Sequence, residues 1–476
     1  MKFTTSAKKI SAVITAALAA VALAPMTAMA APTSGTDVAD STLTVNDLLN
    51  GDTVSAYQIA DADIDAHNNL TYHFVSGLPA EYDSADELSH VATDGTSFKQ
   101  GSAMQNAAAK IATAMTGKAA YTSATAQGTS ATLTLGSGYY LVRVTSTSGK
   151  TRVYQNMVID ATPQTVPGAQ RYETRRLDPI NVKKTDVNVT KTVDEGKSST
   201  DKHSVGDSIP FAISTAIPSY PADSANATFI IGDKPTEGLE IDPASIEVNG
   251  QKAVSGADYT LTASAGSFKI EYAKTYILAH PGDPVTVTYK ATLTDKAFSN
   301  TQGTTGNTAT ATFNPNPYTG TTVDNTTTPV TVKTYGYVFK KVDEAGKALK
   351  GATFTLRLSN GKVLTSTSDD NGYVFFEDLA AGEYTAEETG VPSGYQKTSD
   401  LRFTLNGQTA KSDNPATANI AENNYAVSQQ DVVDKKLPTL PVTGAAGITL
   451  MVLAGIALLG GGSALIIRSS RKVTRS

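Results

Sequence analysis

Short runs with a period of two are the feature that most limits what this 476-residue chain can fold into. Along residues 187–193, Val187, Val189, Lys191 and Val193 alternate with polar residues. Along 307–313, an Asn, two Ala and a Phe alternate with three Thr. Such alternation is typical of half-buried strands, and turn residues separate the runs. The pattern predicts an all-β chain of tandem β-sandwich domains.

The two ends of the chain carry signals of another kind. Lys2, Lys8 and Lys9 precede an apolar run and the small residues of 28–30, which predicts a cleaved signal peptide over residues 1–30. Near the other end, 23 residues without a charge, 445–467, are followed by a basic tail. An apolar stretch of that length can span a bilayer, and the basic residues stay on the cytoplasmic side. The sequence therefore predicts a secreted chain that is held at the cell surface.

Composition excludes several classes of protein. A net charge of −6 excludes a dominant nucleic-acid footprint. The chain has no cysteine, so disulfides cannot reinforce a secreted protein of this kind. Its five His are scattered, without metal-ligand spacing, and neither a nucleophile motif nor a phosphate-binding loop occurs. We expect no cofactor, no metal and no enzymatic turnover.

Turn signals and changes of composition divide the mature chain into domains over residues 31–178, 179–333 and 334–436, followed by a terminal segment over 437–476. In the first domain we expect strands over 43–45 and 53–59, a hairpin of 139–145 with 152–159, and an inserted amphipathic helix over 97–116. In the third domain, Ser359-Asn360-Gly361 and Asp370-Asn371-Gly372 predict hairpin turns.

Two lysines stand on otherwise apolar strand faces, Lys191 and Lys341, each in the first strand of its domain. A lysine in this position usually extends its ammonium group to water, or forms a buried ion pair. Here each lysine is accompanied by a candidate acid and by an Asn or Asp in a late strand. Because the combination occurs twice, it favours a chemical role for Lys191 and Lys341.

The central domain resembles the isopeptide-forming domain of Gram-positive backbone pilins. The resemblance rests on Val189-Thr190-Lys191-Thr192-Val193, Asp233-Lys234-Pro235 and Asn307-Thr308-Ala309. It implies that Lys191 supplies the amine, Asn307 the acceptor carboxamide and Asp233 the catalytic acid. Burial would lower the pKa of the lysine and raise that of the acid, so that the bond forms once and without an enzyme. No such lysine stands in the first strands of domain one, where we expect no bond.

The third domain resembles a collagen-adhesin B-type domain, and residues 384–395 resemble the E box of pilins. Alternation places Glu388 on the face of Tyr384 and Ala386. The resemblance implies a bond from Lys341 to Asp434 with Glu388 as the acid. An Asn is more usual at the position of Asp434, so this bond would release water where the other releases ammonia.

The segment Leu440-Pro441-Val442-Thr443-Gly444, with the apolar span and basic tail, resembles the sorting signal that a sortase cuts between Thr and Gly. The whole chain resembles the backbone (major) subunit of a covalent pilus of the actinobacterial fimbrial type. That resemblance implies that a class C pilin sortase joins Thr443 to a lysine near the boundary of the first two domains. Lys183 or Lys184 is the candidate, with a preference for Lys184, although the usual Tyr-Pro-Lys ending is absent.

The partners implied are further copies of the chain, a tip or accessory pilin, and peptidoglycan reached through a housekeeping sortase. The main alternative is a monomeric wall-anchored adhesin, or an accessory pilin that binds a host glycan or matrix protein. Such proteins share the sorting signal and the third-domain signature but need no acceptor lysine. The sequence identifies no ligand for either case.

Overall fold

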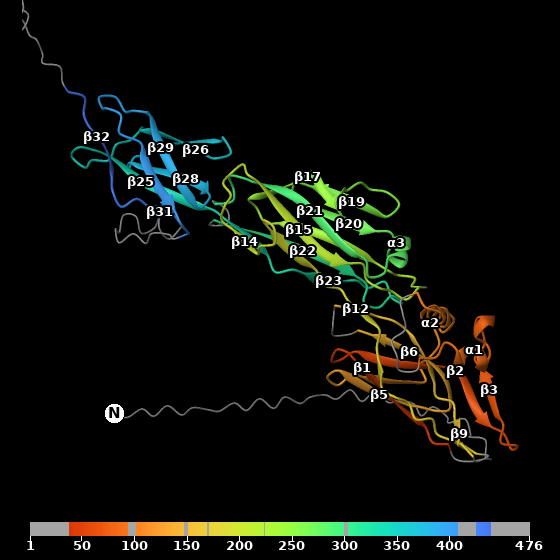
Figure 1. Cartoon of the computed structure of the whole chain (residues 1–476). Coiled ribbons are helices and arrows are strands. Elements are labelled where there is room, and N and C mark those ends of the chain that lie inside the picture. The colour runs from red at the N-terminus through yellow and green to blue at the C-terminus, as the bar shows by residue number, and fades with distance from the viewer. Residues whose placement is uncertain are drawn as a thin grey trace, which may run out of the picture.

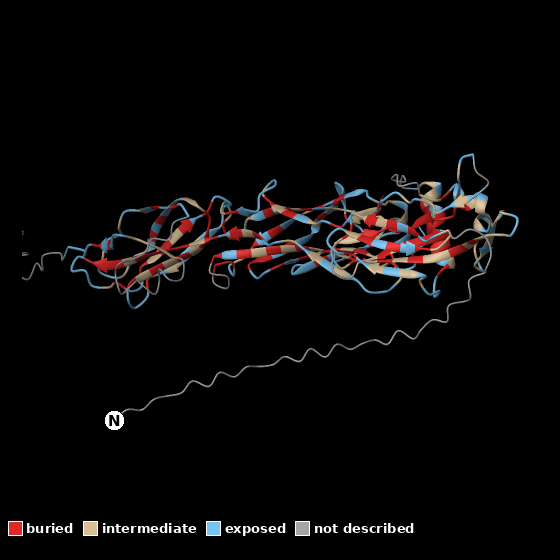
Figure 2. Ribbon diagram, turned by 90° about the horizontal axis from the view of Figure 1, so that it is seen from below, coloured by how far each residue is buried: buried red, intermediate tan, exposed pale blue. Residues whose placement is uncertain are grey.

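The computed structural model describes residues 38–93, 101–146, 151–168, 171–222, 224–298, 303–407 and 425–438. These residues form β-rich units that follow one another in an elongated row (Figure 1). Buried and exposed positions alternate along most strands (Figure 2), as the period of two predicts. The all-β prediction is confirmed. No helix within the described ranges is long and apolar enough to cross a membrane, and the predicted span at 445–467 lies outside them.

The first unit packs small sheets against one another and against helices. Strand β1 lies between β11 and β5, and a second sheet has the order β3–β2–β6–β8, with β4 also on β2. Its elements are β1 (Ser41–Asn46), β2 (Thr53–Ile64), β3 (Leu70–Phe74), η1 (Ala80–Tyr82), α1 (Ala85–Ser89), α2 (Ala103–Ala114), β4 (Thr122–Thr125), β5 (Ser130–Leu135), β6 (Gly138–Thr145), β7 (Arg152–Tyr154), β8 (Met157–Asp160), β9 (Gln164–Thr165), β10 (Tyr172–Glu173), β11 (Ile180–Asn181) and β12 (Lys184–Asp186).

The predicted inserted helix is present as α2. Ser102 caps its amino-terminal end, because the Ser102 hydroxyl accepts a hydrogen bond from the Gln105 backbone amide (3.3 Å). Ala107, Ile111 and their neighbours bury the inner face of α2 in a cluster with Leu141 and Val158 of the sheet. The predicted strand over 152–159 is wrong in one respect: it is two strands, interrupted at the buried residues 155–156, whose side chains turn toward the second unit.

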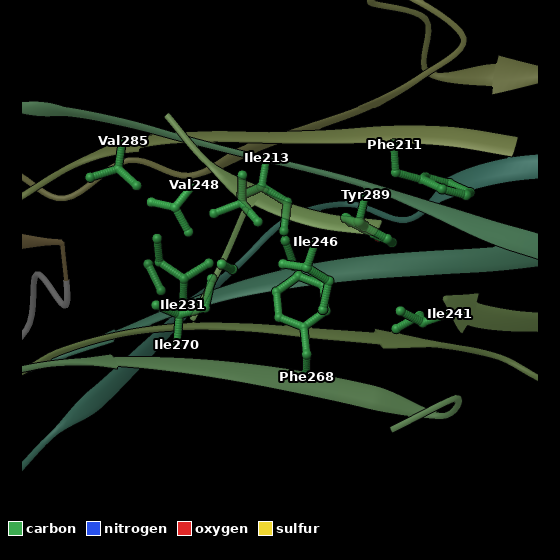
Figure 3. Close-up of a cluster of buried hydrophobic side chains, with 14 of the residues drawn as sticks. Phe211, Ile213, Ile231, Ile241, Ile246, Val248, Phe268, Ile270, Val285 and Tyr289 are labelled. Atoms are coloured by element: carbon green, nitrogen blue, oxygen red, sulfur yellow. The ribbon is translucent and has the colours of Figure 1, made fainter. Parts of the chain in front are cut away.

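The second unit is a β-sandwich. One sheet, called here the β13 sheet, has the order β13–β15–β21–β17–β18, and the facing β22 sheet has the order β14–β24–β22–β16–β20–β19, with β23 on β22. The elements are β13 (Thr190–Val193), β14 (Ser199–Thr200), β15 (Ser208–Ala216), β16 (Phe229–Pro235), β17 (Leu239–Val248), β18 (Gln251–Lys252), β19 (Tyr259–Ser264), β20 (Ser267–Tyr272), α3 (Lys274–Ala279), β21 (Pro284–Leu293), β22 (Thr304–Phe313), β23 (Val323–Thr326) and β24 (Val330–Lys333). The inward side chains of both sheets form one core (Figure 3).

The third unit is a smaller sandwich with sheets β28–β25–β31, extended by β32 on β25, and β27–β26–β29–β30. Its strands are β25 (Tyr335–Asp343), β26 (Thr353–Arg357), β27 (Val363–Thr367), β28 (Tyr373–Leu379), β29 (Gly382–Gly390), β30 (Leu401–Leu405), β31 (Tyr425–Val427) and β32 (Val432–Asp434). The turn at 359–361 closes the predicted hairpin of β26 and β27. The turn at 370–372 forms, but it is not a hairpin: β27 pairs with β26 and β28 with β25, so this turn carries the chain between sheets.

The segment after residue 178 lies with the first unit. Ile180 pairs with Val45 of β1, and Lys184 to Asp186 pair with β7. The predicted boundary at 178–179 therefore precedes the last strands that pair with the first unit. The reason is tertiary, because short polar strands such as β12 carry no periodic signal of the sheet they join.

The first two units meet through the loop that follows β22. Tyr318 in this loop packs against the helix-side core of the first unit, and its ring lies 3.7 Å from the Arg143 guanidinium. Asn156 donates a hydrogen bond to the Tyr318 hydroxyl, and the Gln155 side chain donates to the Ser219 carbonyl (2.7 Å). A partly buried cation–π contact and two hydrogen bonds from side-chain amides hold the two units in one orientation.

The second and third units meet at Asp378, which is buried at the end of β28. Its Oδ1 accepts the Phe298 amide (2.7 Å), and its backbone carbonyl accepts the Val205 amide (2.9 Å). Burial raises the pKa of Asp378 to about 6, although the Phe298 amide opposes the shift. A carboxyl group thus joins the two units at a point that water scarcely reaches.

This raised pKa makes the junction sensitive to pH. The folded chain binds the Asp378 proton more tightly than the unfolded chain does. The stabilisation of the fold that this protonated carboxyl contributes is therefore complete below about pH 4 and is lost as the pH rises through about 6. Asp378→Asn keeps an oxygen acceptor without a charge. At pH 8 we expect this variant to unfold at a higher temperature than the native chain, with a free energy of unfolding larger by on the order of 1 to 3 kcal/mol. At pH 4 we expect the two chains to unfold at similar temperatures. A gain of equal size at both pH values would contradict the assignment. Asp63→Asn, at a half-exposed position in the first unit, serves as the control.

Candidate cross-linking sites

The first site lies between the two sheets of the second unit. Lys191 stands on β13, whereas Asp233 and Asn307 stand on β16 and β22 of the facing sheet. In the antiparallel register of β16 and β22, Pro235 pairs with Asn307 and Asp233 with Ala309. Asp233 and Asn307 are thus two positions apart and face the same side, which is the interior. The alternation that marked Lys191 in the sequence directs its side chain into the same space.

The three predicted residues meet around one hydroxyl group. Lys191 Nζ contacts Asp233 Oδ2 and lies 2.5 Å from the Tyr289 hydroxyl, to which it donates. The Asn307 Nδ2 donates to the same hydroxyl at 2.8 Å. The side chains of Lys191 and Asp233 are fully shielded from solvent. An amine, a carboxyl and a carboxamide therefore share one dry pocket.

Aromatic rings surround this pocket. Phe211 stacks on Tyr289 with centroids 5.5 Å apart, and Phe268 meets Tyr289 edge-on at 5.1 Å. Figure 3 shows Phe211 and Tyr289 together in the core with Phe268 across from them. Burial among these rings lowers the pKa of Lys191, against the attraction of Asp233, and raises the pKa of Asp233. Both shifts favour the neutral amine and the protonated acid.

Two oxygen atoms in this pocket have no hydrogen-bond partner among the described residues, Asp233 Oδ1 and Asn307 Oδ1. Buried polar atoms are rarely left in this state, because each costs free energy without a partner. A proton on Asp233 is suited to the carbonyl oxygen of Asn307. The polar atoms are therefore matched when the acid holds a proton and donates it toward the carboxamide.

Sequence reasoning assigned no role to Tyr289. The sequence did contain a signal for it, since Tyr289 shares the inward face of its strand with Val287 and Ala291. A buried tyrosine hydroxyl needs a partner, and this one contacts both the Lys191 amine and the Asn307 carboxamide. Burial and the nearby Asp233 raise the pKa of Tyr289, which keeps the hydroxyl protonated.

The second site joins neighbouring strands of one sheet. Strand β32 runs parallel to β25, with Lys341 opposite Val432 and Asp343 opposite Asp434. Lys341 Nζ lies 2.5 Å from Asp434 Oδ1 and donates to the Val432 carbonyl (3.3 Å). Both side chains are fully shielded from solvent. Among the described residues, neither Asp434 oxygen accepts a hydrogen bond of normal geometry, despite the short approach of the amine.

Glu388 reaches this pair from β29 in the facing sheet. It is buried, and one of its oxygens accepts the Thr398 amide (2.8 Å). Burial and the neighbouring Asp434 raise the pKa of Glu388. Its neighbour Glu387 lies on the outer face and forms an exposed ion pair with Lys397 (2.6 Å). The structure thus places Glu388 inward, where the alternation in the sequence predicted it.

The candidate polymerisation residues lie apart from both pockets. Lys184 begins β12 at the edge of the first unit, and its ammonium contacts the Asp47 carboxylate. Lys183 precedes it and is half-buried, with its backbone carbonyl bound to the Gln155 amide (2.9 Å). The sorting motif lies outside the described residues, and so does the predicted signal peptide over residues 1–30. The motif consists of Leu440, Pro441, Val442, Thr443 and Gly444.

Comparison with known proteins assigns families to the carboxyl-terminal part of the chain. Residues 336–418 match the SpaA-type prealbumin-like fold domain, and residues 432–474 match the LPXTG cell wall anchor motif. The trypsin-resistant surface T6 protein of Streptococcus pyogenes serotype M6 is 27% identical over 247 residues, which make up 47% of this chain. The match spans 45% of that relative, about half of its length.

Solved structures share the fold over most of the chain. The T6 backbone pilin of serotype M6 Streptococcus pyogenes, described as a modular three-domain structure, matches with a TM-score of 0.63 at 17% identity, over 85% of this chain and 100% of that one. The full-length major pilin SpaD from Corynebacterium diphtheriae matches with a TM-score of 0.53 at 17% identity, over 84% and 98%. The chain therefore shares its fold with these backbone pilins over most of its length, and its carboxyl-terminal part matches a prealbumin-like domain and an LPXTG cell-wall anchor motif.

Proposed function

We propose that the chain is the shaft subunit of a covalent surface pilus. A class C sortase joins Thr443 of one copy to a linker lysine of the next, and a housekeeping sortase attaches the fibre to peptidoglycan. The observation that carries the proposal is the pair of buried lysine–acid–acceptor clusters. Each would tie an early strand of its unit to a late one, as a load-bearing subunit requires. The chain itself turns over no substrate in this role.

In the second unit, the neutral Lys191 amine attacks the side-chain carbonyl carbon of Asn307. Asp233 protonates the carbonyl oxygen, and Tyr289 holds the amine and the carboxamide on one hydroxyl. The C–N bond to the Asn307 amide nitrogen breaks, and this nitrogen leaves as ammonia with a proton taken from the Lys191 nitrogen. Asp233 carries that proton between the two nitrogens and is regenerated.

In the third unit, Lys341 attacks the carboxyl carbon of Asp434 under the acid Glu388. Here a C–O bond breaks and water leaves with the transferred proton. An acid in place of the usual amide suits this pocket, because the Lys341 amine already lies against Asp434 and a protonated Glu388 can hydrogen-bond the carboxyl. An ordinary buried ion pair is the competing interpretation, and it would add little stability.

The position of each bond determines what it does under load. The Lys191–Asn307 bond would connect the two sheets of one sandwich, and the Lys341–Asp434 bond would connect adjacent parallel strands. By analogy with disulfides that close loops of about a hundred residues, each bond would contribute about 4 to 5 kcal/mol through the unfolded state. A pulling force would then act on covalent bonds and would not separate the strands.

The intact mass of the mature chain tests both bonds. We expect it to fall below the sequence mass by one ammonia and one water. Asp233→Asn should restore the ammonia, because the acid that activates Asn307 is gone, and Glu388→Gln should restore the water. Glu387→Gln is the matched control, since it makes the same change on the outer face. An unmodified mass in the native chain would rule out both bonds.

Immunoblots of cell-wall extracts test polymerisation. Cells that express the chain with its sortase should yield a ladder that survives boiling, and Thr443→Ala should reduce it to one band. The double variant Lys183→Arg with Lys184→Arg should do the same, because no linker amine remains. A single monomer band from the native chain would instead favour the wall-anchored adhesin, whose host glycan or matrix ligand the described residues do not identify.

A further inference from the structure

The acceptor lysine has a carboxylate partner from the same chain. This inference rests on the proposed polymerisation. We propose that Lys184 is the acceptor and that Asp47 orients its amine and takes its proton when the inter-subunit bond forms. The argument uses the backbone that holds each residue, the contact between them and the requirements of the reaction.

The strand that carries Lys184 is held from both sides. On the side of the first unit, β12 pairs with β7, and the Val187 amide donates to the Thr151 carbonyl (2.6 Å). On the side of the second unit, the Ser219 amide donates to the Thr185 hydroxyl (3.2 Å). A nucleophile on such a strand occupies a defined place, whereas one on a free linker would not.

Asp47 is fixed in an unusual backbone conformation. It follows β1 directly, with a φ of 69°, in the left-handed region that costs most residues free energy. Arg152 donates to its backbone carbonyl (3.1 Å), while the Arg152 Nε donates to the Asp186 carboxylate (2.6 Å). Arg152 thus supports the Asp47 backbone, while the charge of Arg152 is paired with Asp186 and not with the Asp47 carboxylate. The Asp47 carboxylate remains directed at Lys184.

The Lys184 side chain is 17% exposed and that of Asp47 is 51% exposed. A partly exposed ion pair of this kind contributes little to stability, typically about 1 kcal/mol or less, which does not account for the strained backbone. The half-open carboxylate can accept a proton and pass it to water, and the pair remains accessible to an enzyme. For Lys183, by contrast, the described residues provide no ion pair.

The reaction requires this proton transfer. An ammonium group cannot attack, so Lys184 Nζ first gives a proton to Asp47 Oδ1. The neutral amine then attacks the thioester that links the sortase cysteine to Thr443 of a second copy. The C–S bond breaks as the amide forms, and the departing thiolate takes the second proton from Lys184. The products are the amide, a neutral Asp47 and the free thiol, so that atoms and charge balance.

Among the described residues, the other charged or titratable side chains on β12 and β7 are engaged elsewhere. Asp186 on β12 pairs with Arg152 of β7, and the Tyr154 hydroxyl on β7 donates to the buried Asp52. Lys183, which directly precedes the strand, is the remaining charged residue beside Lys184 in the sequence. Asp47 is therefore the carboxylate in direct contact with the Lys184 amine among the described residues.

The test measures ladder formation by the full chain on cells shifted to buffers of pH 6.5 and 8.5. Asp47→Asn removes the charge, and Asn tolerates a positive φ as well as Asp does. We expect joining to slow about tenfold or more at pH 6.5 and to recover in part at pH 8.5, because solvent then takes the proton. Glu81→Gln, which breaks an ion pair with Lys110 elsewhere in the first unit, should leave joining unchanged.

Mass spectrometry of the cross-linked peptide provides the second measurement, and the expected bond joins Thr443 to Lys184. Native joining rates for Asp47→Asn at both pH values would overturn the inference, as would a bond to Lys183. Neither of those results would affect the proposed pilus, since a ladder would still form. If the native chain formed no ladder on immunoblots, the proposed function itself would be contradicted. Unchanged surface amounts and protease resistance of Asp47→Asn would show that the fold is intact.

Discussion

The cost of burying a lysine amine is the constraint on which the arrangement of the chain depends. A charged ammonium between two apolar sheets is strongly unfavourable, so Lys191 must either lose its proton or find a partner. The core supplies an acid whose own burial favours its protonated form, together with a carboxamide and a tyrosine hydroxyl. The same desolvation that would destabilise an ion pair thus prepares a neutral nucleophile beside a neutral acid. In the proposed cross-linking, the instability of the charged state is also what would make the amine reactive.

The two pockets reach this result by different topologies. In the second unit the lysine and its proposed acceptor come from opposite sheets and meet across the core. In the third unit they come from adjacent strands, and the acid comes from the facing sheet. Asn307 lacks a partner for its carbonyl oxygen, and Asp434 lacks normal partners for both oxygens. Both acceptors are therefore poorly satisfied within the described residues.

The junctions between units are as specific as the cores. Tyr318 from the second unit fills a place in the first, and Asp378 from the third binds two amides of the second. These contacts turn three sandwiches into one extended body (Figure 1). Because β12 lies between the first two units, the junction also determines where the Lys184 amine stands. Stiffness and the placement of the proposed acceptor thus depend on the same interface.

The sequence by itself determined the all-β class, the inward faces of Lys191, Lys341 and Glu388, and the signals at both ends. These features follow from local rules, since a period of two decides which side chains share a face and an uninterrupted apolar run is recognisable without a fold. Only the tertiary structure decided what those faces meet. The hydroxyl of Tyr289, the interrupted strand at 155–156 and the pairing of β12 with β7 depend on residues far away in the chain. So does the contact of Asp47 with Lys184, because 136 intervening residues must fold before a strained turn after β1 can reach the edge strand.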